Sequence, residues 1–524
     1  MKTLRIPLVG SAHHRQSADS NIIPAIDTSD QRFVNVVFKR DANSLIPNTL
    51  YRVVKRPGID TGTTTTSTST GPYSGCGVTQ DVGNPYHSLA IYPSTSSVHA
   101  ITVILGLDGS PVTVQVSTHV TASRPFLLSD ASADEYAMYT IYSSNGSHTK
   151  GFYTKCVGSS TQQIIDIDYN AQQTAGSHAF LDGYVFYMTM TGRIHNSELN
   201  NISSFVATDF VTVQDQSFGR GLARYKDKIV AFGSNYIEFY ENVGNQTGSP
   251  LQQLDHLRIR GHGLWVDTPG GTALASVCPS QFYLAAMDTV FWINGSGSDA
   301  GVGVYMLDGF RQRKISTDDV DFSLSRIFEG NLKIQGLVNI FGYRYLVIST
   351  GNQSTDFVCA YCVDLGCWVT WESGLFTSTI GPFVNNKVIT DGMQNEVLVY
   401  AGTRVHKFDI ESLLYSDISY TDNDVGYSAI IQTRGLDFGT DKNKILHRVT
   451  LVGLTARETS NCVLSYSDDD GVTWSSGRTI DISQSWKSLS RWGKFRNRQF
   501  RITNGSDASM ELAAIEFEYE VCRS

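Results

Sequence analysis

The stretch His178-Ala-Phe-Leu-Asp-Gly-Tyr-Val-Phe-Tyr187 has the local pattern of a β-hairpin. Apolar and aromatic residues flank an Asp-Gly pair, and such pairs favour the positive φ angles of a tight hairpin turn. The same cycle of strand, turn and aromatic-rich strand recurs at Met287-Asp-Thr-Val-Phe-Trp-Ile293. Further Asp-Gly or Asn-Gly turn signals occur at Leu107-Asp-Gly109, Ser144-Asn-Gly-Ser147, Leu307-Asp-Gly309 and Thr390-Asp-Gly392. The pattern predicts serial antiparallel hairpins.

The composition supports a mainly β chain with room for more than one domain. The chain has 524 residues, of which 46 are glycine, 11% are aromatic and 17% are charged. A chain of this length exceeds what one small core holds. Alternating strand-like runs are common, and helical periods are hard to find. Examples of such runs are 236–240, 397–400 and 448–452.

Three segments differ in character. Residues 1–60 contain short apolar runs punctuated by prolines, which predicts an extended N-terminal arm. Residues 61–425 read as serial short strands, which favours a β-propeller-like body, although one or more sandwiches would give similar local text. Within it, the Thr/Ser-rich tract 61–71 is expected to be an exposed loop rather than a polar edge strand. Residues 426–524 predict a compact C-terminal β module, for which a sandwich is one arrangement.

Charge and hydropathy exclude several classes of protein. The net charge of −9 argues against a general nucleic-acid binder, but it suits a surface past which a duplex slides. No stretch is apolar over the ~18 residues that a membrane span requires. The apolar run near the N-terminus is interrupted by Arg5 and is too short for the core of a signal peptide. We therefore expect no membrane insertion and no export by the usual route.

The cysteines predict structure rather than chemistry. The eight cysteines are scattered, which is too sparse for a secreted disulfide framework. The pair Cys359 and Cys362, with Cys367 nearby, suggests zinc, but strand positions three apart point to opposite faces. No second CxxC or nearby histidine pair completes a tetrahedral site. We expect buried, reduced thiols, and neither a metal nor a cofactor.

One motif suggests catalysis at first sight. Ser467-x-Asp469-x-Gly471-x-Thr473-Trp474 matches the Asp box, a turn motif that recurs in sialidase propellers. A sialidase also needs three converging arginines, a Tyr–Glu pair and an acid/base Asp. The chain has a single Asp box, near its C-terminal end. We interpret Ser467, Asp469, Gly471 and Trp474 as a structural hairpin lock and predict no catalytic residue. Trp474→Ala should cost ~3–5 kcal/mol if the ring is buried.

Basic and aromatic residues alternate between Trp486 and Arg501. Such interleaving occurs in single-strand nucleic-acid sites, but an acidic chain also places cations at subunit contacts. The segment leads into an alternating strand at 500–503, which favours a role in a protein interface or in the fold over a DNA contact. The candidate residues are Lys487, Arg491, Lys494, Arg496, Arg498 and Arg501.

Several strings, taken in their order, resemble one known family. Phe33-Val-Asn-Val-Val-Phe38 precedes Val54-Lys-Arg-Pro-Gly-Ile59, and Ile229-Val-Ala-Phe-Gly-Ser-Asn-Tyr-Ile-Glu-Phe-Tyr240 precedes Gly261-His-Gly263. The Asp-box hairpin and the stretch 491–502 follow. Together they resemble the packaged-DNA stabilisation, or tail hub and nozzle, proteins of short-tailed bacteriophages (podophages).

The resemblance implies a structural virion protein without enzymatic activity, assembled in the cytoplasm of the bacterial host. Members form a homo-hexameric ring in the phage tail, below the portal and the adaptor (head-to-tail) protein. This ring continues the channel for the double-stranded DNA, retains packaged DNA and anchors tail fibres or tailspikes and a tip or needle protein. Two alternatives stay open: a virion-associated glycan hydrolase and a receptor-binding lectin, each on a β-propeller.

Overall fold

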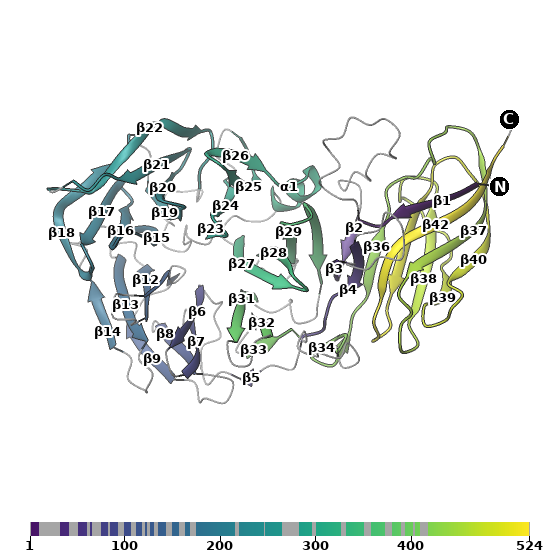
Figure 1. The fold of residues 1–524 in the computed structure, drawn as a ribbon, viewed down its shortest axis with the longest axis horizontal. Helices are drawn as coiled ribbons and strands as arrows, with labels where there is room; N and C mark the ends of the chain where they lie inside the picture. Colours follow the sequence, from purple (N-terminus) through teal and green to yellow (C-terminus); the bar gives the residue numbers. More distant parts are fainter. Residues whose placement is uncertain are drawn as a thin grey trace.

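The computed structural model contains a ring of β-sheets joined to a β-sandwich (Figure 1). For the strands within 63–167 and 380–407 only the backbone is described. The remaining described residues are 2–9, 32–40, 51–59, 174–214, 219–245, 247–264, 282–295, 300–325, 332–349, 358–372, 408 and 418–522. The mainly β class and the propeller-like body are confirmed.

Seven sheets follow one another around the ring in the described part of the chain. The first sheet contains β6 (Gly75–Asp81), β7 (Asn84–Tyr92), β8 (His99–Leu105) and β9 (Val112–Ser117). The second contains β10 (Thr121–Ala122), β11 (Phe126–Ser129), β12 (Glu135–Tyr142), β13 (Thr149–Cys156) and β14 (Gln163–Ile167). The third contains β15 (Thr174–Leu181), β16 (Tyr184–Thr189), β17 (Arg193–Glu198) and β18 (Asn201–Thr212).

The fourth sheet contains β19 (Gly219–Tyr225), β20 (Lys228–Gly233), β21 (Tyr236–Asn242) and β22 (Leu251–Arg260). The fifth contains β23 (Tyr283–Ala286), β24 (Thr289–Asn294), β25 (Gly303–Asp308) and β26 (Arg311–Lys314). The sixth contains β27 (Lys333–Ile340), β28 (Tyr343–Ser349), β29 (Val358–Cys362) and β30 (Cys367–Trp371). Helix α1 (Asp318–Ser325) lies between the fifth and sixth sheets in sequence. The seventh sheet contains β31 (Ile380–Val388), β32 (Gln394–Ala401), β33 (Arg404–Lys407) and β5 (Thr63–Thr64).

The ring is closed by a strand from the start of the chain. The inner strands of successive sheets contact one another: β11 and β12 do so for the second sheet, and the first strand does so for the other sheets. β31 of the last sheet contacts β6 of the first. The outermost strand of the seventh sheet is β5, which precedes the first sheet in sequence and pairs with β33. Thr63 and Thr64 therefore form an edge strand, which corrects the expectation of a loop at these two positions. The rest of the 61–71 tract lies outside the described residues.

Tight turns join the first two strands of several sheets. Asp182 and Gly183 have φ angles of 51° and 85°, as the Asp-Gly pair in the opening stretch predicts. Met287 and Asp288 have φ angles of 57° and 55° at the corresponding turn of the fifth sheet. At the predicted turn 307–309, which joins β25 (Gly303–Asp308) to β26 (Arg311–Lys314), Gly309 has a φ angle of 66°. The remaining predicted turns, at 107–109, 144–147 and 390–392, lie outside the described residues.

The sandwich is built from both ends of the chain. One sheet contains β1 (Lys2–Pro7), β3 (Val36–Arg40), β4 (Tyr51–Lys55), β37 (Lys444–Gly453), β40 (Ser488–Phe495) and β42 (Glu511–Val521). The other contains β2 (Arg32–Val34), β36 (Ala429–Gln432), β38 (Asn461–Ser467), β39 (Arg478–Asp481) and β41 (Gln499–Asn504). Both sheets bury residues in a common core, including Phe38 and Phe517 from the first and Phe500 from the second.

The ring is thus an insertion into the sandwich. The segment 1–60, predicted as an extended arm, supplies β1 to β4, and the sandwich resumes at β36 after the hairpin of β34 (Thr421–Asp422) and β35 (Val425–Gly426). One parallel pair, Val34 with Thr370, joins β2 to β30 and so continues the sixth sheet into the sandwich. The domain boundaries at 60/61 and 425/426 stay predictions.

Candidate functional site

The Asp box forms a hydrogen-bonded hairpin tip. The backbone N–H groups of Asp469 and Gly471 donate to Ser467 Oγ at 3.3 and 2.9 Å. Asp469 accepts from the Thr473 N–H at 2.9 Å and from the Thr473 hydroxyl at 2.5 Å. The Thr473 bonds, with that of Ser467, lower the pKa of the Asp469 carboxyl to about 2. Every acceptor bond of this carboxylate serves the turn, which is what a structural lock requires.

Two arginines connect this tip to the sandwich. Asp468, beside the motif, forms a bidentate pair with Arg498, with both N–O distances at 2.7 Å. The guanidinium of Arg501 lies 3.7 Å from the centre of the Trp474 ring, and the Trp474 indole donates to the Gly471 carbonyl at 3.0 Å. The tryptophan is half-buried and packs beneath the turn. These contacts describe a hairpin support.

We expect Trp474→Ala to lower the free energy of unfolding by about 2 kcal/mol, because the ring is half-buried and full burial would cost about 3–5 kcal/mol. Thermal unfolding followed by circular dichroism measures the effect. Val472→Ala is the matched control, since Val472 is at the same tip and 81% exposed. If Trp474→Ala left the melting temperature unchanged and abolished a catalytic activity, the structural interpretation would be wrong.

The six predicted cations do not form one surface. Lys487 is buried, and its Nζ donates to the carbonyls of Gly453 and Leu454 at 3.1 and 2.7 Å. Arg498 is also buried, with 2% of its surface exposed. The expectation of an interface or DNA contact is therefore corrected for these two residues, because both bind within the chain. Half-buried Arg501 covers Trp474.

The other three cations, Arg491, Lys494 and Arg496, are exposed. Arg491 and Lys494 lie on β40, at the edge of its sheet in the described part of the sandwich. Arg491 and Gly493 have φ angles of 67° and 78°, and the pairing of β40 with β37 shifts register there. The irregularity turns charged side chains outward at a sheet edge, which discourages strand-to-strand aggregation.

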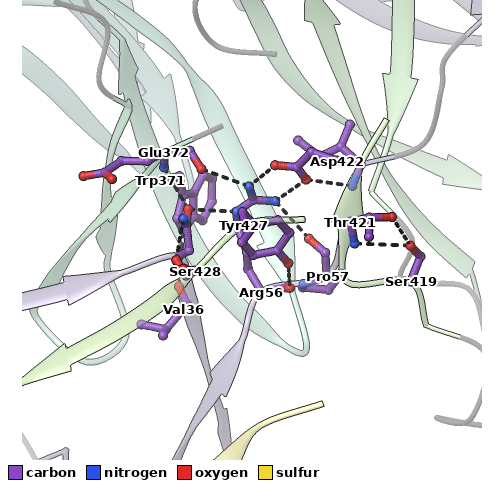
Figure 2. A network of polar contacts seen from close by, with 12 residues as sticks. Val36, Arg56, Pro57, Trp371, Glu372, Ser419, Thr421, Asp422, Tyr427 and Ser428 are labelled. Atoms are coloured by element: carbon purple, nitrogen blue, oxygen red, sulfur yellow. Dashed lines mark hydrogen bonds and ion pairs between the residues drawn. The ribbon is translucent and has the colours of Figure 1, made fainter. Parts of the chain in front are cut away.

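An extensive buried polar network lies where the ring joins the sandwich (Figure 2). Arg56 is fully buried and forms a bidentate ion pair with Asp422, which is 3% exposed. Its Nε donates to Asn35 Oδ1 at 3.2 Å, and its remaining N–H groups donate to the carbonyls of Pro57 and Glu372 at 3.1 and 3.3 Å. All five N–H groups of the guanidinium have acceptors, which is the condition for burying this charge.

The network also fixes the crossing of two chain segments. The centre of the Tyr427 ring lies 4.0 Å from the Arg56 guanidinium carbon, and the Tyr427 hydroxyl donates to the Arg56 carbonyl. A Cβ atom on Gly58 would lie 2.1 Å from the Thr421 carbonyl oxygen. Only glycine therefore fits at this crossing. We call residues 56–59 with 418–423 the neck.

The strings that carry the family resemblance meet in pairs. Asn35, from the first string, contacts Arg56 of the second at the neck. The third and fourth strings meet between the fourth and fifth sheets, where the Leu264 N–H donates to the Gly233 carbonyl at 2.9 Å. A Cβ atom on Gly263 would lie 2.5 Å from that same carbonyl oxygen. Both pairs are structural joints.

A tyrosine–glutamate pair lies on β21. The Tyr240 hydroxyl donates to Glu238 Oε2 at 2.7 Å, and Arg258 Nη2 lies 3.1 Å from Glu238 Oε1. A sialidase uses such a combination, but Tyr240 and Glu238 are both fully buried. Burial, followed by the Glu238 charge, raises the pKa of Tyr240, whereas a nucleophile needs it lowered. This pair is thus unsuited to glycan hydrolysis and joins the third and fourth sheets instead.

Of the cysteines in the described part of the chain, four are buried in strands, as the sequence predicts, whereas Cys522 is half-buried and follows β42. Cys359 and Cys362 are free thiols on β29, and burial raises the pKa of both. Among the described residues, no group of three or more His, Cys, Asp or Glu side chains is placed to hold a metal ion. Within the same residues, no helix combines the length and apolar character needed to cross a membrane.

Comparison with known proteins gives likeness of fold alone. No family model and no curated protein matches the chain. The computationally designed Ika8 protein matches at 10% identity and a TM-score of 0.35, over 67% of this chain and 99% of its own. YCF48 bound to D1 peptide matches at 11% and 0.36, over 68% and 99%. An exo-β-1,3-galactanase from Phanerochaete chrysosporium matches at 11% and 0.28, over 89% and 100%.

Proposed function

We propose that the chain is a structural virion protein, the tail hub or nozzle of a short-tailed phage. Six copies form a ring that continues the DNA channel below the portal and adaptor. The ring retains packaged DNA and anchors tail fibres or tailspikes and the tip protein. The protein acts by assembly and by rigidity, and it has no catalytic step.

The observation that carries the proposal is the pairing of the resemblance strings. Asn35 with Arg56, and Gly233 with Gly263, come from different strings that are neighbours along the sequence, and each pair meets at a joint of the fold. Strings that maintain a shared architecture are expected to lie at such joints. The joints connect the ring to the sandwich and one sheet to the next.

The physical character of the chain also supports a conduit. Buried residues of one continuous core run from the sandwich into the sixth sheet, and a second core joins the fourth, fifth and sixth sheets. Such packing resists deformation. The net charge of −9 limits adhesion to a passing duplex. Arg491, Lys494 and Arg496 are exposed and stay candidates for contacts between subunits.

The test is the assembly state of the purified chain, alone and mixed with the adaptor protein of the same phage. Mass photometry and negative-stain electron microscopy should show a ring with six-fold symmetry, and electron microscopy of the virion should locate the chain in the tail. A strictly monomeric particle in the presence of adaptor would overturn the proposal. Turnover of a sialoside or host polysaccharide, or saturable glycan binding by the isolated protein, would favour the hydrolase or the lectin instead.

A further inference from the structure

The chain passes through the neck twice, and the two passages are bonded to each other. On the way into the ring, the Gly58 N–H donates to the Ser419 carbonyl at 2.7 Å. The Ile59 N–H lies 3.1 Å from both the Thr421 carbonyl and Asp422 Oδ1. On the way out, the Asn423 N–H donates to the Ile59 carbonyl at 2.7 Å. Ile59 is therefore held by the segment that leaves the ring.

Ile59 also begins the pairing that closes the ring. It forms an antiparallel bridge with Phe408, just beyond β33. A few residues later, Thr63 and Thr64 of β5 pair with Val405 and Arg404 of β33 in the same antiparallel sense. The neck and the closing strand thus follow one line of backbone pairing. With only two residues, β5 has few hydrogen bonds of its own, so its position depends on how firmly Ile59 is held.

Asp422 connects this line to the sandwich. One carboxylate carries both the bidentate pair with Arg56 and the bond to the Ile59 N–H. Arg56 is fixed to the sandwich in turn through Asn35, which follows β2 and donates to the Ser428 carbonyl at 2.9 Å. A shift of the sandwich relative to the ring therefore pulls on Arg56 and Asp422 before it reaches β5.

We propose that the Arg56–Asp422 pair is a latch that couples the position of the sandwich to the closure of the propeller ring. While the pair is intact, Ile59 is fixed and β5 stays on β33. When the pair separates, β5 leaves β33 and the ring loosens at the seam between the seventh and first sheets. A partner that displaces the sandwich would open the ring at this seam. The inference does not depend on the proposed function.

Hydrogen–deuterium exchange of the full chain tests the latch. In Asp422→Asn, amides of β33 and β5 should exchange about tenfold faster or more, while those of β20 and β21 keep their wild-type rates. The matched control is Asp364→Asn, which breaks the partly exposed pair with Arg344 in the sixth sheet. It should leave β33 unchanged. Equal acceleration in all sheets, or wild-type exchange of β33 in folded Asp422→Asn, would overturn the proposal.

Two further variants separate a latch from general destabilisation. Arg56→Lys keeps the charge but loses the bidentate geometry, and it should give the same local acceleration if Asp422→Asn does not fold. Thr63→Cys with Val405→Cys, oxidised to a disulfide, joins β5 to β33 at a directly paired position. Added to Asp422→Asn or Arg56→Lys, it should return the exchange of β33 to within about twofold of wild type. Failure of the disulfide to restore protection would contradict the latch.

Discussion

Arg56→Met should lower the free energy of unfolding by about 3–5 kcal/mol, because it leaves the Asp422 carboxylate buried without its counter-charge. Asp422 is 3% exposed and would keep only its bond to the Ile59 N–H. Methionine fills much of the volume of the arginine stem, so the loss reports mainly on charge and hydrogen bonding. Urea unfolding at neutral pH measures it.

The control for Arg56→Met is Arg5→Met. Arg5 pairs with Glu516 across β1 and β42, but its side chain is 39% exposed, and a surface pair contributes about 0–1 kcal/mol. Combining Arg56→Met with Asp422→Leu removes both charges and should recover part of the loss. If Arg56→Met costs no more than Arg5→Met, the neck contributes little to stability.

The local hairpins could be predicted from the sequence, because their determinants lie within a few residues. Asp182 and Gly183 adopt the positive φ angles that their residue types favour. Ser467, Asp469 and Gly471 form the expected turn for the same reason. The number of sheets could not be predicted, because the sheets share no repeated sequence motif. The turn of the fifth sheet that corresponds to Asp182 and Gly183 is formed by Met287 and Asp288.

Only part of the neck network could be predicted from the sequence. Asn35 is a polar residue inside an apolar run, which is a signal that its side chain needs a buried partner. Nothing local identifies Asp422 as the partner of Arg56, because it lies 366 positions from Arg56. Pairing over such a distance is fixed by topology, here by the insertion of the ring into the sandwich.

The burial of two cations in the basic segment could not be predicted from strand alternation. The sequence makes Lys487 and Arg498 candidates for an interface or a DNA contact, yet both are buried. Lys487 directly precedes β40 and Arg498 lies between β40 and β41, so the two-residue period of a strand assigns a face to neither. Arg498 then turns inward to Asp468, which precedes the Asp-box carboxylate by one position.

Acidification from pH 7 to about 4 should lower the free energy of unfolding, because the unfolded chain binds more protons over this range than the folded chain does. His178, on the first strand of the third sheet, is buried, and burial lowers its pKa to about 4 from 6.5. Its contribution is fully present above pH 6.5 and is lost as the pH falls to about 4. The difference of roughly 2.5 pKa units corresponds to the order of 3 kcal/mol.

His195 acts in the same direction, since burial and the neighbouring Arg193 also lower its pKa to about 4. Asp469 titrates in a separate window, because its pKa of about 2 affects stability only as the pH falls below 3.8. Urea midpoints measured between pH 7 and about 4.5 therefore isolate the contribution of the histidines.

His178→Gln cannot take up the proton, so its urea midpoint should fall less over this range than that of the wild type. His256→Gln, at an exposed position of β22, should follow the wild-type curve. If His178→Gln kept the full wild-type pH dependence, the burial of His178 would not be the source of the acid sensitivity.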